Sequence, residues 1–234
     1  MCGRYIIREQ EAAERYWRVH GLPKWVTSFN VAPSAIVPAI RRARAPESAD
    51  APNEGVLLRW GLVPYWARGV PPRYTTFNAR VERIDSAPAF RDAWARGQRC
   101  ILPAAGFYEW QQRGSSRQPF FIGLADREVF GFAGLWDRSI GADGTVTHSC
   151  TLLTMDANRL LTEIHNTGHR MPAILREEDH ELWLAGGPGD ARAVLKPYAD
   201  DLMVAWPVSP RVGSPKNDDE DLTHPLTEVQ GSLL

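Results

Sequence analysis

The feature that most constrains the fold is a series of five β-like segments between residues 99 and 155. They cover residues 99–105, 107–111, 119–124, 129–135 and 146–155. Two of the connections, Arg-Gly-Ser-Ser at 113–116 and Gly-Ala-Asp-Gly at 141–144, are typical of tight turns. Because connections this short join antiparallel neighbours, the pattern predicts an antiparallel β-rich centre.

Shorter elements are expected on either side of this centre. Helical patterns cover residues 8–19, 88–97, 156–164, 177–185 and 189–196. Further strands are expected at 35–40, 55–62, 173–175 and 202–208. The charged, Pro- and Ala-rich stretch 41–54 is expected to be a surface loop, and the polar stretch from 214 onward to be extended or loose. No linker divides the chain, so we expect one domain.

The composition excludes several classes of protein. With 234 residues and 44% hydrophobic content, the chain can bury one sizeable core. It has no apolar run of 18 residues, and charges such as Arg4, Arg8 and Glu11 rule out a signal peptide at its start. We therefore expect a cytoplasmic protein that does not enter membranes.

The sequence carries no cofactor signature. Its three cysteines, Cys2, Cys100 and Cys150, form no Cys-x-x-Cys pair, which argues against a disulfide framework and against a zinc site. His165 and His169 are four apart, but Gly168 lies between them in a loop-like composition, so a helical zinc pair is not expected. Phosphate-binding glycine motifs are also absent. We expect neither a metal nor a small-molecule cofactor.

The net charge of −1 conceals an uneven distribution along the chain. Residues 1–120 hold 18 basic and 10 acidic side chains, a net charge of +8, whereas residues 121–234 hold 9 and 18, a net charge of −9. A basic first half can bind a polyanion, and the dominance of arginine favours bidentate phosphate contacts. An arginine-rich composition can equally reflect a GC-rich genome, and halves of a sequence need not be faces of a fold.

Cys2 follows the initiator methionine and becomes the first residue once that methionine is removed. It would then carry a thiol and an α-amine on adjacent carbons. Such a pair reacts twice with an aldehyde: the amine forms an imine, and the sulfur closes a five-membered thiazolidine ring. The usual pKa values, roughly 8 for the amine and about 8.5 for the thiol, leave reactive fractions near neutral pH. A cysteine at this position is nevertheless often without a special role.

Glu109 and His165 are the other candidates for proton transfer. Glu109 lies between Tyr108 and Trp110 in a β-like segment, where partial burial would raise its pKa; strand alternation can equally point it to water. His165 follows Ile164 and can exchange protons near neutrality, or it can be a capping or core histidine.

Eight ordered motifs together resemble the SRAP family of SOS-response-associated, abasic-site-processing proteins, over residues 1 to about 226. They are Met-Cys-Gly-Arg-Tyr at 1–5, Asn-Val-Ala-Pro at 30–33, Trp-Gly-Leu-Val-Pro at 60–64, Asn-Ala-Arg-Val-Glu at 78–82, Gly-Phe-Tyr-Glu-Trp at 106–110, Ile-His-Asn at 164–166, Arg-Met-Pro at 170–172 and Val-Ser at 208–209. The resemblance implies an α+β fold: a single β-rich domain over residues 1–226, with a mostly antiparallel barrel-like sheet, flanking short helices and a C-terminal tail at 227–234.

The resemblance also implies the activity and the catalytic residues. A member of this family senses abasic sites in single-stranded DNA and becomes covalently attached to them, with Cys2 as nucleophile. Asn78 matches the asparagine that orients the nucleophile and the sugar. Glu109 matches the acidic residue that moves protons during formation and reversal of the cross-link, and His165 matches a second acid or base at the sugar oxygen. His169 is assigned no role.

The DNA-binding residues implied by the resemblance are Arg4, Arg80 and Trp66. The two arginines match residues that hold backbone phosphates beside the lesion, a contact that depends on salt and little on sequence. Trp66 lies in the loop where the family stacks an aromatic on a base, although it can also be a core residue. Ala67 follows it, where many relatives have another aromatic or basic residue. The expected partner is single-stranded DNA bound by a monomer.

Two other function classes stay open at this stage. Class II glutaminases, which are N-terminal-nucleophile amidohydrolases, also begin Met-Cys-Gly, but their Asn-Gly-Glu and Arg-Gly-Pro-like motifs are missing here. A non-catalytic single-strand binder would need Arg4, Arg80 and Trp66 but not Cys2. Within the leading hypothesis, peptidase activity on the protein's own first residue and a lyase-type nick are further possibilities.

Overall fold

The computed structural model describes residues 2–8, 10–17, 19, 23–43 and 53–226. Its larger sheet contains a closed barrel in which each strand is bonded to the next in the order β10, β4, β3, β6, β9 and back to β10. The barrel strands are β3 (Ile36–Arg42), β4 (Asn53–Trp60), β6 (Arg99–Ala104), β9 (Phe130–Ile140) and β10 (Val146–Asp156). The edge strands are β5 (Asn78–Arg80), β11 (Arg170–Pro172) and β12 (Ile174–Leu175).

Strand β10 closes the barrel. Its first seven residues pair antiparallel with β9, while Ser149 and Cys150 pair parallel with the end of β4. Where β4 ends, β5 takes over as the parallel neighbour, with Asn78 beside Leu152 and Arg80 beside Thr154. The Asn-Ala-Arg segment is therefore fixed to the barrel by main-chain bonds.

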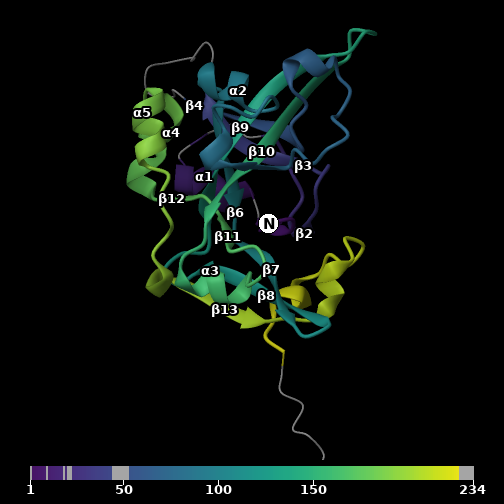
Figure 1. The fold of residues 1–234 in the computed structure, drawn as a ribbon, viewed down its shortest axis with the longest axis vertical. Coiled ribbons are helices and arrows are strands. Elements are labelled where there is room, and N and C mark those ends of the chain that lie inside the picture. Colours follow the sequence, from purple (N-terminus) through teal and green to yellow (C-terminus); the bar gives the residue numbers. More distant parts are fainter. Residues whose placement is uncertain (1, 9, 18, 20–22, 44–52, 227–234) are drawn as a thin grey trace, which may run out of the picture.

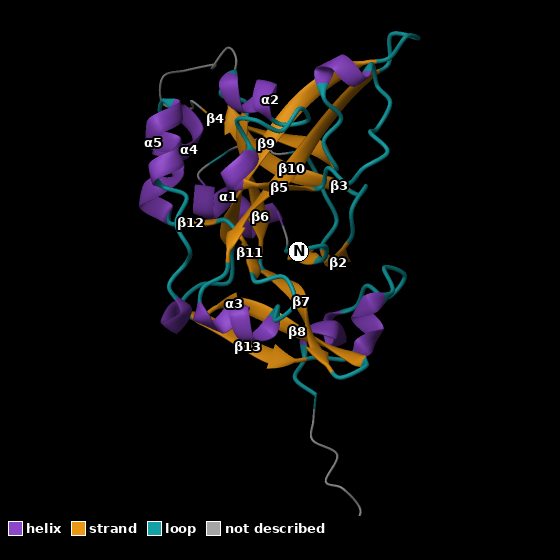
Figure 2. Cartoon of the chain, viewed as in Figure 1, coloured by secondary structure: helices purple, strands orange, loops and turns teal. Residues whose placement is uncertain are grey.

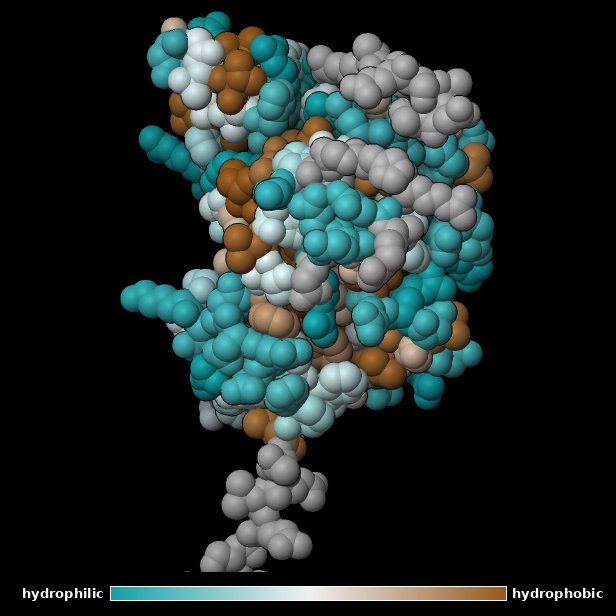
Figure 3. Space-filling model, turned by 180° about the vertical axis from the view of Figure 1, so that it is seen from behind, coloured by the Kyte–Doolittle hydropathy of each residue, from teal (hydrophilic) through white to brown (hydrophobic). Residues whose placement is uncertain are grey.

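A second sheet is antiparallel throughout, in the order β13, β8, β7, β1, β2. Its strands are β1 (Tyr5–Ile7), β2 (Ser28–Val31), β7 (Gly106–Arg113), β8 (Ser116–Leu124) and β13 (Met203–Pro207). Only Ala105 separates β6 from β7, so the chain passes directly from the barrel into this sheet. In Figure 1 the barrel forms the upper part, the second sheet the lower part, and the N-terminus lies between them. Seen from behind, the outline is indented on one side between the two parts (Figure 3).

Short helices lie around the sheets (Figure 2). The α-helices are α1 (Gln10–Trp17), α2 (Arg91–Ala95), α3 (Arg159–Ile164), α4 (His180–Ala185) and α5 (Pro188–Ala193). The 3₁₀ turns are η1 (Tyr65–Ala67), η2 (Val81–Arg83), η3 (Glu177–Asp179), η4 (Asp200–Leu202), η5 (Pro210–Gly213) and η6 (Glu220–Thr223). In the described ranges, every helix is too short or too polar to cross a membrane.

Aromatic side chains join the two sheets at β1. The fully buried ring of Tyr5 packs edge-on against Trp60 of the barrel, with ring centroids 5.1 Å apart, and against Phe132, at 5.8 Å. Edge-to-face pairs of this kind add about 0.5–1.5 kcal/mol beyond the burial of their area. The first strand of the chain is thus held in the main core.

The fold class expected from the sequence is confirmed: one β-rich α+β domain with a mostly antiparallel barrel and short helices. The five central strands begin and end within five residues of the predicted positions. The middle of the predicted loop at 41–54 and the tail at 227–234 lie outside the described residues.

The expectation of a loose segment after residue 214 is wrong for residues 214–226. Leu222 is fully buried in a second apolar cluster with Ile6 and Val208. Asp218 Oδ1 accepts hydrogen bonds from the Phe29 amide at 2.6 Å and from Ser28 Oγ. A few well-placed apolar and capping residues dock this polar segment, which its average composition does not reveal.

Gly134 tests the packing of the barrel. It pairs with both Cys100 on β6 and Leu152 on β10, and an added Cβ would lie 2.9 Å from the Thr151 carbonyl oxygen. Because that oxygen belongs to the barrel backbone, Gly134→Ala should lower the free energy of unfolding by about 1–3 kcal/mol. Urea denaturation measures this change.

Gly189→Ala is the matched control. Gly189 lies in α5 with open space around its Cα, so alanine should be neutral or stabilising by up to about 1 kcal/mol. Equal effects of the two substitutions would contradict the barrel packing described here.

Candidate active site

The start of the chain runs along β7. Tyr5 pairs with Phe107, and the Tyr108 amide donates to the Arg4 carbonyl at 3.0 Å. Continuing this antiparallel register toward the N-terminus would place Gly3 opposite Glu109, with Cys2 one residue beyond it. The negative charge of Glu109 acts on the Cys2 thiol, so the two groups lie near each other.

Cys2 is buried, with 1% of its surface exposed. Its Sγ lies 3.7 Å from the Arg4 carbonyl oxygen, and its own carbonyl accepts a hydrogen bond from Asn78 Nδ2 at 2.8 Å. Burial, and then the negative charge of Glu109, raise the pKa of the Cys2 thiol far above its usual range. The resting thiol is therefore protonated at neutral pH.

In the side-chain amide of Asn78 the nitrogen forms a hydrogen bond with a described residue and the oxygen does not. Its Nδ2 holds the Cys2 carbonyl, whereas no described residue donates to its buried Oδ1. Buried acceptors are nearly always satisfied, so this oxygen is suited to a donor from a substrate or an amine. Asn78 and the exposed Arg80 are two residues apart on β5 and share one face of the strand.

Glu109 points inward, not to water, with only 2% of its surface exposed. Burial raises its pKa to about 7, although the positive charge of the chain's amino terminus opposes this shift. Its neighbours Tyr108 and Trp110 point to the other face of β7, where they pack in the second apolar cluster. Of the two interpretations of the sequence, the desolvated carboxylate is correct.

His165 forms the C-terminal cap of α3 and is 9% exposed. Its Nδ1 lies 3.1 Å from the Arg170 carbonyl oxygen and 3.3 Å from the Arg170 amide nitrogen. Burial, followed by the charge of the amino terminus, lowers the pKa of His165, so the ring is neutral at neutral pH. The amino terminus also acts on Cys2 and Glu109. These groups therefore share one electrostatic neighbourhood.

Asn166 fastens this histidine to β7. Its Oδ1 accepts from the Gln112 amide at 2.9 Å, and its Nδ2 donates to the Gln112 carbonyl at 3.0 Å. The side-chain amide thus imitates a neighbouring strand at the edge of the sheet. Gln111 adds a bond to the Glu163 carbonyl, so the end of α3 is held next to the strand that carries Glu109.

Arg170 has a structural role that the sequence did not reveal. Its buried guanidinium forms a two-pronged ion pair with Glu82 at 2.8 and 2.9 Å and another ion pair with Asp156 at 2.8 Å. It also donates to the Thr154 carbonyl at 2.6 Å. Because its main chain contacts His165, this network fixes the ring from behind. The Arg-Met-Pro motif at 170–172 marked this residue in the sequence but not its structural role.

Arg4 and Arg80, the predicted phosphate contacts, differ in their surroundings. Arg80 is exposed beside Asn78. Arg4 is half-buried and donates to the carbonyl oxygens of Gly3 and Gly213. Arg4 is two residues from Cys2 along the chain, and Arg80 is two residues from Asn78.

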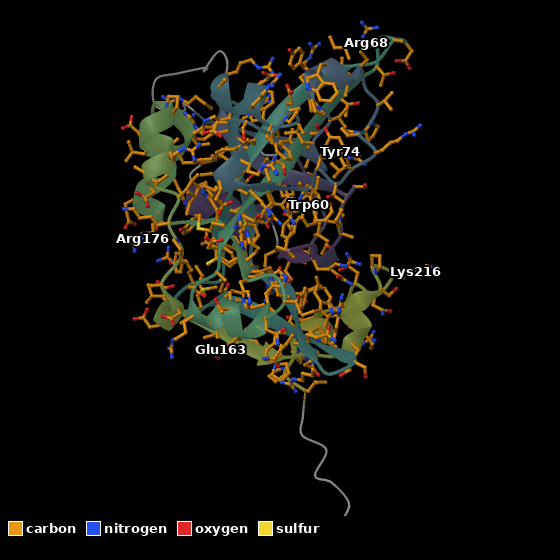
Figure 4. All side chains as sticks on the ribbon, in the orientation of Figure 1. Trp60, Arg68, Tyr74, Glu163, Arg176 and Lys216 are labelled. Atoms are coloured by element: carbon orange, nitrogen blue, oxygen red, sulfur yellow. The ribbon has the colours of Figure 1, made fainter. Side chains whose placement is uncertain are left out.

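Trp66 is not part of this cluster. Its side chain is 44% exposed in η1, and its Nε1 donates to the Pro88 carbonyl. Arg68, two residues later, is labelled at the upper end of the molecule in Figure 4, whereas the N-terminus lies in the middle in Figure 1. Tyr74, also exposed, lies between these positions (Figure 4). Residues 65–74, here named the aromatic loop, thus extend from the upper end toward Asn78, and a core position for Trp66 is excluded.

The described part of the chain contains no group of three or more His, Cys, Asp or Glu side chains arranged to hold a metal ion. What the arrangement offers instead is a buried thiol, a carboxyl group that titrates near neutral pH and a neutral imidazole. Such a set can exchange protons with a substrate carbonyl and attack it.

Comparisons with known proteins identify relatives along nearly the whole chain. The sequence profile of the SOS response associated peptidase (SRAP) family matches residues 1–215. The abasic site processing protein YoqW of Bacillus subtilis is 35% identical over 231 residues, which cover 95% of this chain and 98% of that protein. The abasic site processing protein HMCES of Gallus gallus is 32% identical, over 95% of this chain and 72% of that protein.

Solved structures agree with the sequence relatives. A crystal structure of a protein from Bacteroides thetaiotaomicron superposes with a TM-score of 0.81 at 28% identity, over 97% of this chain and all of that one. A crystal structure from Bordetella bronchiseptica gives a TM-score of 0.77 at 33% identity, over 89% of this chain and all of that one. The chain therefore belongs to the SOS response associated peptidase (SRAP) family.

Proposed function

We propose that this protein captures abasic sites in single-stranded DNA through a thiazolidine formed by Cys2. The observation that carries the proposal is the convergence of Cys2, Asn78, Glu109 and His165 from four distant parts of the chain. The names of the relatives, abasic site processing proteins, agree with this substrate. Removal of the initiator methionine, by an aminopeptidase or by the protein itself, is the required first step.

The proposed reaction is a condensation followed by an addition at the same carbon. The ring-opened sugar presents a C1′ aldehyde, and the α-amine of Cys2 attacks it and expels water to leave an imine. The thiol then adds across the C=N bond: sulfur bonds to carbon, and the proton passes to nitrogen. The net change is the loss of one water. Because the thiol addition consumes the imine, the imine can no longer promote strand cleavage by β-elimination.

Glu109 is the proposed proton carrier for these steps. Because its pKa is about 7, the carboxyl group is present in both forms at neutral pH. As an acid it protonates the departing hydroxyl, and as a base it takes the proton of the Cys2 thiol. The same exchange run backwards would release the DNA.

His165 is proposed to protonate the sugar oxygen as the ring opens; because the resting ring is neutral, it first takes up a proton and then passes it on. With Nδ1 engaged by the Arg170 main chain, Nε2 is the atom that exchanges a proton with the sugar. Gly168 sets the ring position, since an added Cβ would lie 2.6 Å from Cε1 and 2.7 Å from Nε2. A side chain at residue 168 would therefore displace the imidazole.

The aromatic loop is proposed to guide the strand. Trp66 and Tyr74 are exposed rings on which bases can stack, at roughly 1–3 kcal/mol per base, and Arg68 and Arg73 are exposed beside them. Arg80 and Arg4 would hold phosphates next to the lesion. Paired bases cannot stack in this way, which favours single strands.

Cys2→Ala should abolish the heat-resistant adduct with an abasic single-stranded oligonucleotide, because the imine alone hydrolyses. A denaturing gel measures the shifted band. Cys2→Ser is the matched control. Like Cys2→Ala it keeps the α-amine, so borohydride should still trap its imine, but no stable adduct should form without the reductant.

The same assay separates the rival functions. An adduct that forms equally well with Cys2→Ala would contradict the thiazolidine. Glutamine hydrolysis without an adduct would indicate the amidohydrolase, and salt-reversible binding alone would indicate the non-catalytic binder.

Glu109→Gln should change the pH dependence of stability. The folded-state pKa of about 7 exceeds the usual 4.5, so the neutral carboxyl stabilises the fold at low pH and this contribution is lost as pH rises through 7. Between pH 5 and 7 the wild type should lose about 1.4 kcal/mol per pH unit relative to Glu109→Gln. Urea denaturation at pH 5, 6 and 7 measures the difference, and parallel pH curves would refute a buried, neutral Glu109.

Gly168→Ala should slow adduct formation by roughly tenfold to a hundredfold, because a misplaced general acid forfeits much of its catalytic effect. The rate should recover with a pre-opened aldehyde substrate, which does not need ring opening. Gly189→Ala, at an open position in α5, is the control for a glycine substitution and should keep the wild-type rate. An unchanged rate in Gly168→Ala would remove His165 from ring opening.

A further inference from the structure

A second basic site lies away from Cys2, in a hollow of about 520 Å³ beside α2. The side chains that matter are Arg42 at the end of β3, Arg96, Arg99 at the start of β6, and Trp136, Asp137 and Arg138 on β9. The six residues of β6 lead from Arg99 to the start of β7, roughly 20 Å at 3.3 Å per residue. The hollow, here named the arginine hollow, is therefore separate from the site at Cys2.

The charges in the arginine hollow do not cancel. Four arginines line it against one carboxylate, Asp137, which leaves a net charge of +3. Asp137 is already occupied: it pairs with Arg96 at 3.3 Å and accepts from the Tyr65 and Arg138 amides at 2.9 and 2.8 Å. Arg42 has one exposed ion pair, with Glu181, and such pairs contribute little.

Arg99 is the most unusual member. It is 4% exposed, donates to the carbonyl oxygens of Trp183 and Gly186, and forms no ion pair with any carboxylate in the described ranges. Its Nη1 is buried and has no acceptor among the residues that the structure describes. A buried guanidinium without a counter-charge is costly, and an anion in the hollow would offset that cost.

The hollow is continuous with the aromatic loop. The guanidinium of Arg96 lies 4.5 Å from the centre of the Tyr65 ring, and Tyr65 donates its amide to Asp137. Arg138 is exposed, and its guanidinium has no partner among the described residues. Arginine forks match the geometry of phosphate oxygens.

We propose that the arginine hollow is a phosphate-binding site. Two sources of phosphate fit: a backbone phosphate of a DNA strand that has passed the aromatic loop, and a free phosphate compound. At 3.4 Å per nucleotide, the strand source would lie roughly six stacked nucleotides from Cys2. Of the two sources, only the DNA strand depends on the function proposed above.

The test uses the double variant Arg42→Gln, Arg138→Gln, which removes two surface charges without touching the buried Arg99. Its matched control is Arg159→Gln, Arg176→Gln: Arg159 has one exposed ion pair, with Asp200, and Arg176 is exposed far from α2 (Figure 4). Each protein is measured with potassium phosphate against potassium chloride at equal ionic strength, by thermal unfolding. Each is also titrated with undamaged single strands of about six and about twenty nucleotides at several salt concentrations.

If the phosphate belongs to a DNA strand, the Arg42→Gln, Arg138→Gln variant should bind the long oligonucleotide several-fold more weakly. The slope of its log affinity against log salt concentration should fall by roughly 0.7 for each lost phosphate contact. Binding of the short oligonucleotide should be unchanged. For the free compound, phosphate should raise the unfolding temperature of the wild type and of the control but not of the hollow variant.

If neither readout separates the hollow variant from the control, the proposal is wrong. Cross-linking to a short abasic oligonucleotide serves as an independent readout of the proposed function, because it does not need the arginine hollow.

Discussion

The antiparallel pairing of β1 with β7 is the interaction on which the candidate site depends. A strand of three residues cannot hold its place by hydrogen bonds alone. Tyr5 and Ile6 supply the remaining energy, because each is almost completely buried and such burial contributes about 1.5–3 kcal/mol per side chain. Since the register of β1 is fixed in this way, the chain reaches the level of Glu109 at Gly3, and Cys2 is the next residue.

The dry environment of the site explains its chemistry. Burial disfavours charge on every group, so the pKa values of Cys2 and Glu109 rise and that of His165 falls. A protonated thiol, a neutral imidazole and a carboxyl group that is present in both forms near neutral pH can pass protons in either direction. This balance suits the reversible cross-link proposed above.

Local patterns in the sequence predicted the local structure well. Alternation and turn residues gave the five central strands, because each strand is joined to the next by a short connection. The barrel closure was not predictable, since the parallel pairing of β10 with β4 and β5 joins segments about 75 to 90 residues apart. The docking of residues 214–226 was hidden for the same reason: Leu222 and Asp218 act through partners near the start of the chain.

In the candidate site, too, local motifs were predictable and long-range contacts were not. Cys2, Asn78, Glu109 and His165 were expected from their motifs, and the structure brings them together. The burial of Glu109 could not be read from alternation, because both faces of β7 are covered at that position. Asn166 and Gly168 position His165 only through contacts with β7 and with the ring itself, and Trp66 proved to be an exposed residue of a 3₁₀ turn. The motifs identify the reactive groups. The residues that position these groups, and the distances between them, become known only from the fold.

The intact mass of the purified protein, with and without an abasic oligonucleotide, tests the central claim most directly. The account predicts a free chain that lacks the initiator methionine, and an adduct whose mass is the sum of the two reactants less one water. A chain that keeps its methionine and still forms the adduct would contradict it, as would a processed chain that forms none.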